Sequence, residues 1–141
     1  MTAIKSGKNK KNNSMTTLST LNTYESVSPE LVKVWFKASE TARFPKNGGA
    51  CIKYKGKQIA VFNFAREGTW YACQNLCPHK MEMVLSRGML GEESLEPKVA
   101  CPLHKNTFSL KTGRNLNGSL GAIATYPVKV VDGIVYVGFS E

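Results

Sequence analysis

Hydrophobic residues fall in short runs along most of the chain, and polar residues and glycines separate the runs about every ten positions, a spacing typical of β proteins. These runs are rich in β-branched and aromatic residues, and they predict strands at residues 32–36, 50–54, 58–64, 69–73, 126–131 and 134–139. The last two flank Asp132-Gly133, a dipeptide that favours a two-residue hairpin turn. The pattern therefore predicts an all-β protein with antiparallel strands.

The middle of the chain, residues 74–122, interrupts this pattern. Strand-like runs are weak there, and Pro78, Pro97, Pro102 and several glycines break the chain. We expect an antiparallel β-sandwich base, formed by the strands on either side, with a loop-rich subdomain of about residues 74–122 inserted between them.

The first residues differ in composition from the rest. Residues 1–28 are rich in Ser, Thr, Asn and Lys and contain few large apolar side chains, so they predict a disordered basic extension before a domain at 29–141. No apolar segment follows the start as it would in a secretory signal, which favours a reducing, cytoplasmic location; organelle targeting by the extension stays open. No apolar run reaches the roughly 20 residues of a membrane span.

Charge adds little to this picture. The formal net charge is +9, and four lysines of the first 14 residues supply part of it, which leaves +5 for the remainder. A basic surface can face nucleic acid, membrane or an acidic protein, and composition does not choose among them. The simplest interpretation is a solvated tail and a mildly basic surface, with no nucleic-acid partner.

The candidate chemistry lies inside residues 74–122. The chain has two histidines, and each follows a cysteine closely, in Cys77-Pro78-His79 and, after 21 intervening residues, in Cys101-Pro102-Leu103-His104. Two loops that each carry one thiolate and one imidazole are the Rieske arrangement, in which two cysteines bind one iron of a [2Fe–2S] cluster and two histidines bind the other. The pattern predicts Cys77, His79, Cys101 and His104 as the metal ligands and one-electron transfer as the function.

Two other features of the sequence concern metal binding. Zinc is the alternative occupant, because two Cys and two His also form a tetrahedral site. Zinc fingers, however, pair Cys with Cys and His with His at the short spacings, whereas each pair here is mixed. The remaining cysteines, Cys51 and Cys73, lie in predicted strands among apolar residues, and we expect both to be buried core thiols.

Beyond the ligands, the chain from about residue 35 to 137 resembles the small subunit of NAD(P)H-dependent nitrite reductase, a family with the Rieske iron–sulfur protein fold. The matching segments are Gln58-Ile59-Ala60-Val61-Phe62, Cys77-Pro78-His79-Lys80, Leu85-Ser86-Arg87-Gly88, Val99-Ala100-Cys101-Pro102-Leu103-His104-Lys105, Phe108-Ser109-Leu110-Lys111-Thr112-Gly113 and Tyr126-Pro127-Val128. The resemblance implies a cytoplasmic electron-transfer subunit, not catalytic alone, whose redox partner is a large subunit that reduces nitrite to ammonium. A free-standing Rieske ferredoxin that serves an oxygenase or another reductase is the alternative.

The resemblance also has a limit that bears on redox potential. Respiratory Rieske proteins carry an extra cysteine in each ligand loop and join the loops by a disulfide, whereas Glu82 and Leu103 stand at those places here. No serine follows the second loop to donate a hydrogen bond to sulfur. We therefore expect a potential toward the lower end of the range of about −150 to +300 mV seen for Rieske centres.

Overall fold

The computed structural model describes residues 24–141, and its regular structure is almost entirely β. The strands are β1 (Val34–Glu40), β2 (Gly48–Tyr54), β3 (Lys57–Phe64), β4 (Thr69–Gln74), β5 (Leu76–Cys77), β6 (Glu82–Met83), β7 (Met89–Glu93), β8 (Glu96–Ala100), β9 (Thr107–Ser109), β10 (Thr125–Tyr126), β11 (Val128–Val131) and β12 (Ile134–Phe139). The helical pieces are the 3-10 turns η1 (Pro29–Leu31), η2 (Thr41–Arg43) and η3 (Leu85–Arg87). Within these residues, no helix is long and apolar enough to cross a membrane.

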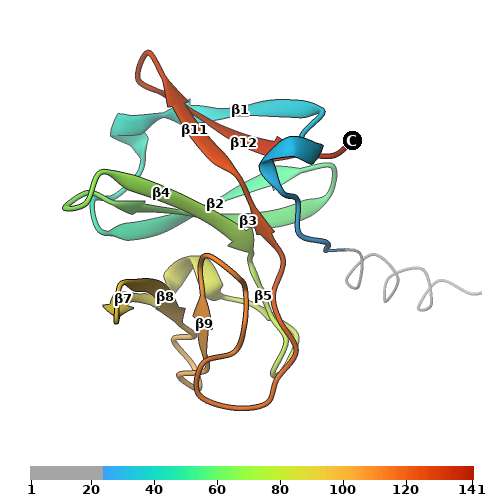
Figure 1. Cartoon of the computed structure of the whole chain (residues 1–141), viewed down its shortest axis with the longest axis vertical. Coiled ribbons are helices and arrows are strands. Elements are labelled where there is room, and N and C mark those ends of the chain that lie inside the picture. Colours follow the sequence, from blue (N-terminus) through green and yellow to red (C-terminus); the bar gives the residue numbers. More distant parts are fainter. Residues whose placement is uncertain (1–23) are drawn as a thin grey trace, which may run out of the picture.

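The strands form two bodies, which Figure 1 shows one above the other. The upper body, the base, holds the sheet β1-β12-β11 and the sheet β10-β4-β3-β2. The lower body, the subdomain, holds the short sheet β5-β6 and the sheet β7-β8-β9, and it leaves the base after β4 and returns at β10. All paired strands are antiparallel. The predicted all-β fold, a sandwich base with an inserted subdomain, is confirmed.

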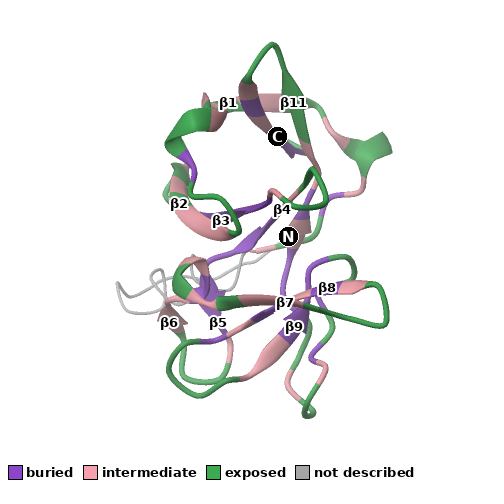
Figure 2. Ribbon diagram, turned by 90° about the vertical axis from the view of Figure 1, so that its left-hand side faces the viewer, coloured by how far each residue is buried: buried purple, intermediate pink, exposed green. Residues whose placement is uncertain are grey.

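Strand β3 lies between two hydrophobic cores. Ile59 and Val61 belong to the core between the two base sheets, whereas Ala60, Phe62 and Phe64 belong to the core between the base and the subdomain. Successive side chains of a strand point to opposite faces, so a strand covered on both faces is apolar at nearly every position. This explains the continuous apolar run at 59–62, and Figure 2 shows the buried residues running through β3 and β4 between the two bodies.

Two buried amide side chains fix the subdomain at the point where it leaves the base. Gln74 donates to the carbonyl of Leu76 at 2.8 Å and accepts from the N–H of Ala124 at 2.7 Å, so it joins the outgoing and the returning chain. Asn75 accepts from the N–H of Ser86 and donates to the side chain of Gln58. These amides satisfy backbone groups that the ends of the strands leave without ladder partners, and they hold the subdomain in one orientation.

Several predicted boundaries differ from the observed ones. Residues 24–28, which we predicted to belong to the disordered extension, pack on the base: Val27 is buried and its N–H donates to the carbonyl of Thr125. The packed region therefore begins before residue 29, because Tyr24 and Val27 supply apolar surface to the base core. Residues 1–23 of the predicted extension lie outside the described residues.

Two further differences concern strands. Residues 74–122 contain β5 to β9, which the sequence did not indicate because these strands are two to five residues long and Pro97 lies inside β8. The predicted strand 126–131 is divided at Pro127 into β10 and β11, which belong to different sheets. Proline has no N–H to donate to a ladder, so a change of sheet at this position costs no hydrogen bond.

Candidate metal centre

The two predicted ligand loops are the turns of two hairpins in the subdomain. Cys77 ends β5, and His79 lies in the turn before β6; Cys101 directly follows β8, and His104 lies in the turn before β9. Each cysteine lies where its turn begins, and each histidine lies nearer the tip of the turn. In both hairpins the thiol is therefore closer to the body of the subdomain than the imidazole is. The structure brings all four predicted ligands to this one end of the subdomain.

The two thiols are buried, with 2% of Cys77 and 1% of Cys101 exposed. Burial raises the pKa of the Cys77 thiol to about 11, and the neighbouring Cys101 thiol adds to the rise. The backbone N–H of His79 and the side-chain amide of Asn106 act in the opposite direction, because a donor that faces sulfur favours the thiolate. Such a thiol is protonated at neutral pH, so a metal that binds here displaces its proton.

The two imidazoles lie side by side at the surface. The ring centroids of His79 and His104 are 4.8 Å apart, with the ring planes at 67° to each other, and both residues are exposed. Two turns distant in sequence therefore present their ring nitrogens to the same small region. This pairing of imidazoles above paired thiols is the geometry that a cluster with two sulfur and two nitrogen ligands requires.

Each ligand turn contains a strained backbone position. Met81 follows His79 by two residues with φ of 55°, and Lys105 directly follows His104 with φ of 59°. Non-glycine residues rarely adopt this left-handed conformation, which costs about 1 to 3 kcal/mol unless the surrounding contacts enforce it. The same conformation occurs in other turns of the described chain, such as those at Lys55 and Asp132, so it shows how tightly the ligand turns are bent.

A third segment, residues 113–122, braces the second ligand turn. The Asn117 side chain donates to the carbonyl of Lys105 at 2.9 Å and accepts from the N–H of Thr107 at 3.0 Å. The Asn115 side chain donates to the carbonyl of Thr107, and the N–H of Leu116 donates to the same carbonyl. The described cysteines form no disulfide, so these amides, and not a covalent link, hold the second ligand turn.

Asn106, between these braced residues, carries a buried polar group that the sequence did not indicate as part of the site. Its side-chain nitrogen is buried and has no hydrogen-bond partner among residues 24–141. Buried polar groups are nearly always paired, so an unpaired donor beside two buried thiols fits a metal centre that supplies acceptor sulfur. The donor set, soft thiolates with imidazoles, also suits iron–sulfur chemistry. The residues present therefore fit a [2Fe–2S] cluster.

The predicted ligands are grouped in pairs, which bears on the kind of metal centre they could form. Among residues 24–141, no three His, Cys, Asp or Glu side chains converge on one metal position. A two-iron cluster needs only two protein ligands for each iron, because bridging sulfides fill the remaining positions. The arrangement in pairs is thus compatible with the cluster.

The other two cysteines lie outside the centre. Cys73 is fully buried, as predicted, and burial raises the pKa of its thiol. The prediction for Cys51 is wrong: this residue is exposed. Its neighbours Ala50 and Ile52 pack on the base core, so the alternation of β2 turns Cys51 to the opposite face of the sheet, where it lies beside the side chains of Gln58 and Asn75 and stays exposed.

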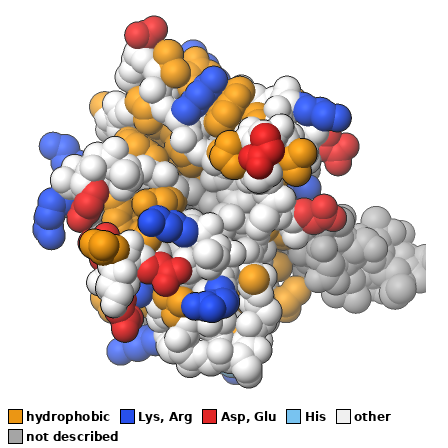
Figure 3. All heavy atoms as spheres, viewed as in Figure 1, with side chains coloured by type: hydrophobic (Ala, Val, Ile, Leu, Met, Phe, Trp, Pro, Cys, Tyr) orange, Lys and Arg blue, Asp and Glu red, His pale blue; other side chains and the backbone are white. Residues whose placement is uncertain are grey.

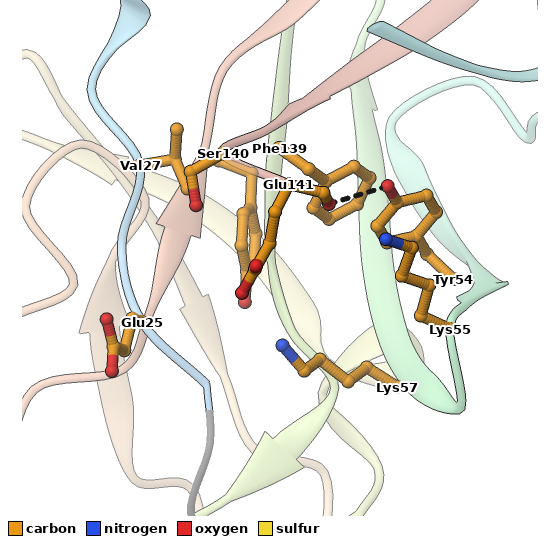
Figure 4. Close-up of a pocket in the computed structure, with 9 residues that line it drawn as sticks. Glu25, Val27, Tyr54, Lys55, Lys57, Phe139, Ser140 and Glu141 are labelled. Atoms are coloured by element: carbon orange, nitrogen blue, oxygen red, sulfur yellow. Dashed lines mark hydrogen bonds between the residues drawn. The ribbon is translucent and has the colours of Figure 1, made fainter. Parts of the chain in front are cut away.

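A cavity of about 290 Å³ lies in the base, and the predicted ligands do not line it. Figure 4 shows Glu25 and Lys57 around it, and the hydroxyl of Tyr54 donates to the backbone carbonyl of Glu141 at 2.8 Å. The cavity mixes acidic, basic and aromatic groups without a set of metal-ligating side chains. It is therefore separate from the candidate centre.

An all-β base that holds two hairpins, each with one buried thiol and one exposed imidazole, defines a class of protein: a small β domain built around a metal centre with mixed sulfur and nitrogen ligands. Within that class, the chain belongs to the Rieske-like [2Fe-2S] domain family, whose sequence model matches residues 34–138.

Relatives of the chain include nitrite reductases and oxygenase ferredoxins. It is 38% identical to the nitrite reductase [NAD(P)H] large subunit of Klebsiella oxytoca, over 76% of this chain and 11% of that protein. It is 36% identical to the ferredoxin component of the naphthalene 1,2-dioxygenase/salicylate 5-hydroxylase systems of a Ralstonia species, over 68% of this chain and 86% of that protein. The chain thus spans about a tenth of the length of the first of these relatives and most of the second.

A solved structure gives the same result for the fold. The nitrite reductase [NAD(P)H] small subunit of Erwinia carotovora is 30% identical, with a TM-score of 0.64, over 76% of this chain and 82% of that one. The family and the fold expected from the sequence are confirmed.

Proposed function

We propose that the chain transfers electrons one at a time as the small subunit of an NAD(P)H-dependent nitrite reductase, with Cys77 and Cys101 on one iron of the cluster and His79 and His104 on the other. When bound, the cluster accepts and releases single electrons. The observation that carries the proposal is the pairing of the two imidazoles, 4.8 Å apart, above two buried thiols. The burial of the thiols keeps water away from the sulfur side of the centre. The exposed histidines offer electrons the shortest path to a partner.

The partner in this proposal is the nitrite reductase large subunit, in the cytoplasm. Relatives of this chain include a nitrite reductase large subunit and a small subunit, which supports that choice. This chain alone is proposed to carry electrons and not to transform a substrate, because among residues 24–141 no second group of metal-ligating side chains accompanies the predicted ligands. Reduction of nitrite to ammonium would then take place on the large subunit.

The exposed surface around the histidines suits a protein partner. Met81 and Leu103, beside the two histidines, are 43% and 51% exposed, and Lys80 and Lys105 flank them. An apolar centre with a charged rim is the usual composition of a docking surface. On the face that Figure 3 shows, basic and acidic side chains are interspersed and do not form one continuous basic field.

A free-standing ferredoxin that reduces an oxygenase is the second candidate, and the Ralstonia relative favours it. Both candidates use the same four ligands and the same fold, so only the partner separates them. Addition of the chain to its cognate large subunit should restore nitrite-dependent oxidation of NAD(P)H if the first candidate is correct. Reduction of an oxygenase, without that effect, would favour the second.

The test of the centre itself is electron paramagnetic resonance of the full chain, purified without air and reduced with dithionite. We expect the signal of a reduced two-iron cluster with couplings to two histidine nitrogens, and iron and sulfide in equal amounts. A spectrum without a signal, together with zinc or no metal in the analysis, would contradict the proposal and favour a structural role.

Reversal of charge at Lys80 and Lys105, both to Glu, tests the docking surface. In the part of the chain that the structure describes, neither lysine is in an ion pair, so both are available to an acidic partner. We expect electron transfer to the cognate partner to slow by about tenfold at low salt, with a smaller effect at high salt, because rim charges act on the association rate. Stopped-flow absorbance measures this rate.

The matched control for the charge reversal is the pair Lys37→Glu and Lys53→Glu, which changes the net charge equally on exposed positions of β1 and β2 in the base. If this pair slows the reaction as much as the pair beside the histidines, net charge is responsible and the docking surface is wrongly placed.

A further inference from the structure

Asn106 is held in place by its own backbone and by the residues on both sides. Its carbonyl accepts from the N–H of Cys101 at 2.8 Å, which closes the second ligand turn. The Asn117 side chain bonds to the carbonyl of Lys105 and to the N–H of Thr107, so it fixes the chain immediately before and after Asn106. The position of Asn106 is therefore set by contacts that do not involve its side chain.

The side chain thus fixed points a donor into the candidate centre. The Asn106 amide nitrogen is buried without a partner among the described residues, although an amide can donate two hydrogen bonds. It lies beside the sulfur of Cys77, and the bond from the N–H of Cys101 to the carbonyl of Asn106 keeps it at the second ligand turn. Cys77 and Asn106 belong to different hairpins, so the donor of one hairpin faces the sulfur of the other.

An unpaired donor is unfavourable in the protein by itself. A buried amide loses its hydrogen bonds with water and recovers the loss only if an acceptor meets it. Thiolate and sulfide sulfur are such acceptors, and a hydrogen bond to an anionic acceptor is stronger than one between neutral groups. The unpaired amide is therefore stabilised when sulfur beside it carries negative charge and accepts its hydrogen bond.

We infer that Asn106 donates a hydrogen bond from its side-chain amide to sulfur of the cluster centre, on the Cys77 side, and thereby raises the reduction potential. The inference rests on the proposed ligation by Cys77, His79, Cys101 and His104. Reduction adds negative charge to the sulfur, so a donor stabilises the reduced form more than the oxidised form. Asn106 is a positioning and tuning residue, and it supplies a side-chain donor at the second loop, which no serine follows.

The test is the substitution Asn106→Leu, which keeps the approximate volume and removes the donor, in the full chain with its cluster. Protein-film voltammetry should show a lower midpoint potential. We expect the equilibrium constant for reduction of the cluster to fall about tenfold, which corresponds to about 59 mV for a one-electron couple. Asn106→Ser retains a short donor and should recover part of the shift. If Asn106 acts only in packing, the two variants should change thermal stability and cluster retention, but the midpoint potential should not fall from the unsubstituted chain to Asn106→Ser and then to Asn106→Leu.

Asn63→Leu is the matched control. Asn63 is also a buried asparagine, but it lies on β3 in the base, and its substitution should leave the potential unchanged. A second measurement uses the unsubstituted chain with its asparagine side chains labelled with ¹⁵N. Pulsed electron paramagnetic resonance of the reduced protein should detect coupling to one amide and to its exchangeable proton.

The outcomes separate the inference from the function on which it rests. An intact mixed-ligand signal with the same potential in Asn106→Leu and Asn106→Ser would overturn the inference and leave the proposed function. If Asn106→Leu does not retain the cluster, the labelled unsubstituted chain decides, and lack of amide coupling there overturns the inference. Lack of any cluster signal in the unsubstituted chain would overturn the proposed function as well.

Discussion

Substitution of His104 with alanine is expected to abolish the cluster while the protein remains folded. His104 is exposed, so removal of its side chain should change the free energy of unfolding of the metal-free protein by no more than about 0.5 kcal/mol. As a proposed iron ligand, however, it has no substitute: the chain contains one other histidine, His79, which is already assigned. Even residues that only support ligands change metal affinity by about 10- to 100-fold, so the loss here should be at least as large.

Iron and sulfide content and the visible absorption spectrum measure the effect, and circular dichroism checks the fold. Leu103→Ala is the control, because Leu103 is exposed in the same turn and carries no ligand atom. Retention of a full cluster in the His104 variant would show that the second iron has another ligand. Equal cluster loss in both variants would mean that the turn, and not the imidazole, is responsible.

The second large effect is expected for Gly113→Ala. Gly113 has φ of +81°, and a methyl group built on it would overlap the carbonyl oxygen of Ile123. The N–H of Ile123 donates to the carbonyl of Gly113 at 2.8 Å, so the two segments of the chain cannot move apart without loss of this bond. We expect destabilisation of about 2 to 4 kcal/mol, since left-handed strain and a backbone clash act together.

Chemical denaturation measures the destabilisation, and Gly121→Ala is the matched control. Gly121 lies in the same segment, has no left-handed φ, and a methyl group there would meet nothing within 4 Å. The Gly113 variant should also retain its cluster less well, because residues 113–122 brace the second ligand turn through Asn117. If both glycine variants are equally stable, the close approach to Ile123 is not maintained in solution.

The base was predictable from local pattern, and its errors have identifiable causes. Strand β12 was predicted with its observed ends, and β2, β3 and β4 within two residues. The short strands of the subdomain were not predicted, because a strand of two to five residues shows no periodicity that differs from a loop. In β8, Pro97 also argued against a strand, although the carbonyl of Pro97 accepts from the N–H of Leu110.

The candidate ligands were predictable for a different reason. Cysteine and histidine at spacings of two and three residues form a chemical pattern that holds within a single turn, so it needs no knowledge of distant contacts. The structure supports the prediction by bringing the two turns together. It also gives the third segment, 113–122, a bracing role through Asn115 and Asn117, which the abundance of Gly and Asn there did not specify.

The sequence by itself determined the all-β class, the hairpin at Asp132-Gly133, the family and the four candidate ligands, because each of these depends on residues that are close along the chain. The tertiary structure alone decided that β3 is buried on both faces, that Cys51 is exposed, that residues 24–28 pack on the base, and that the Asn106 amide lies beside Cys77. These features depend on contacts between segments that are distant along the chain, and the local sequence around a residue does not specify which distant segment packs against it.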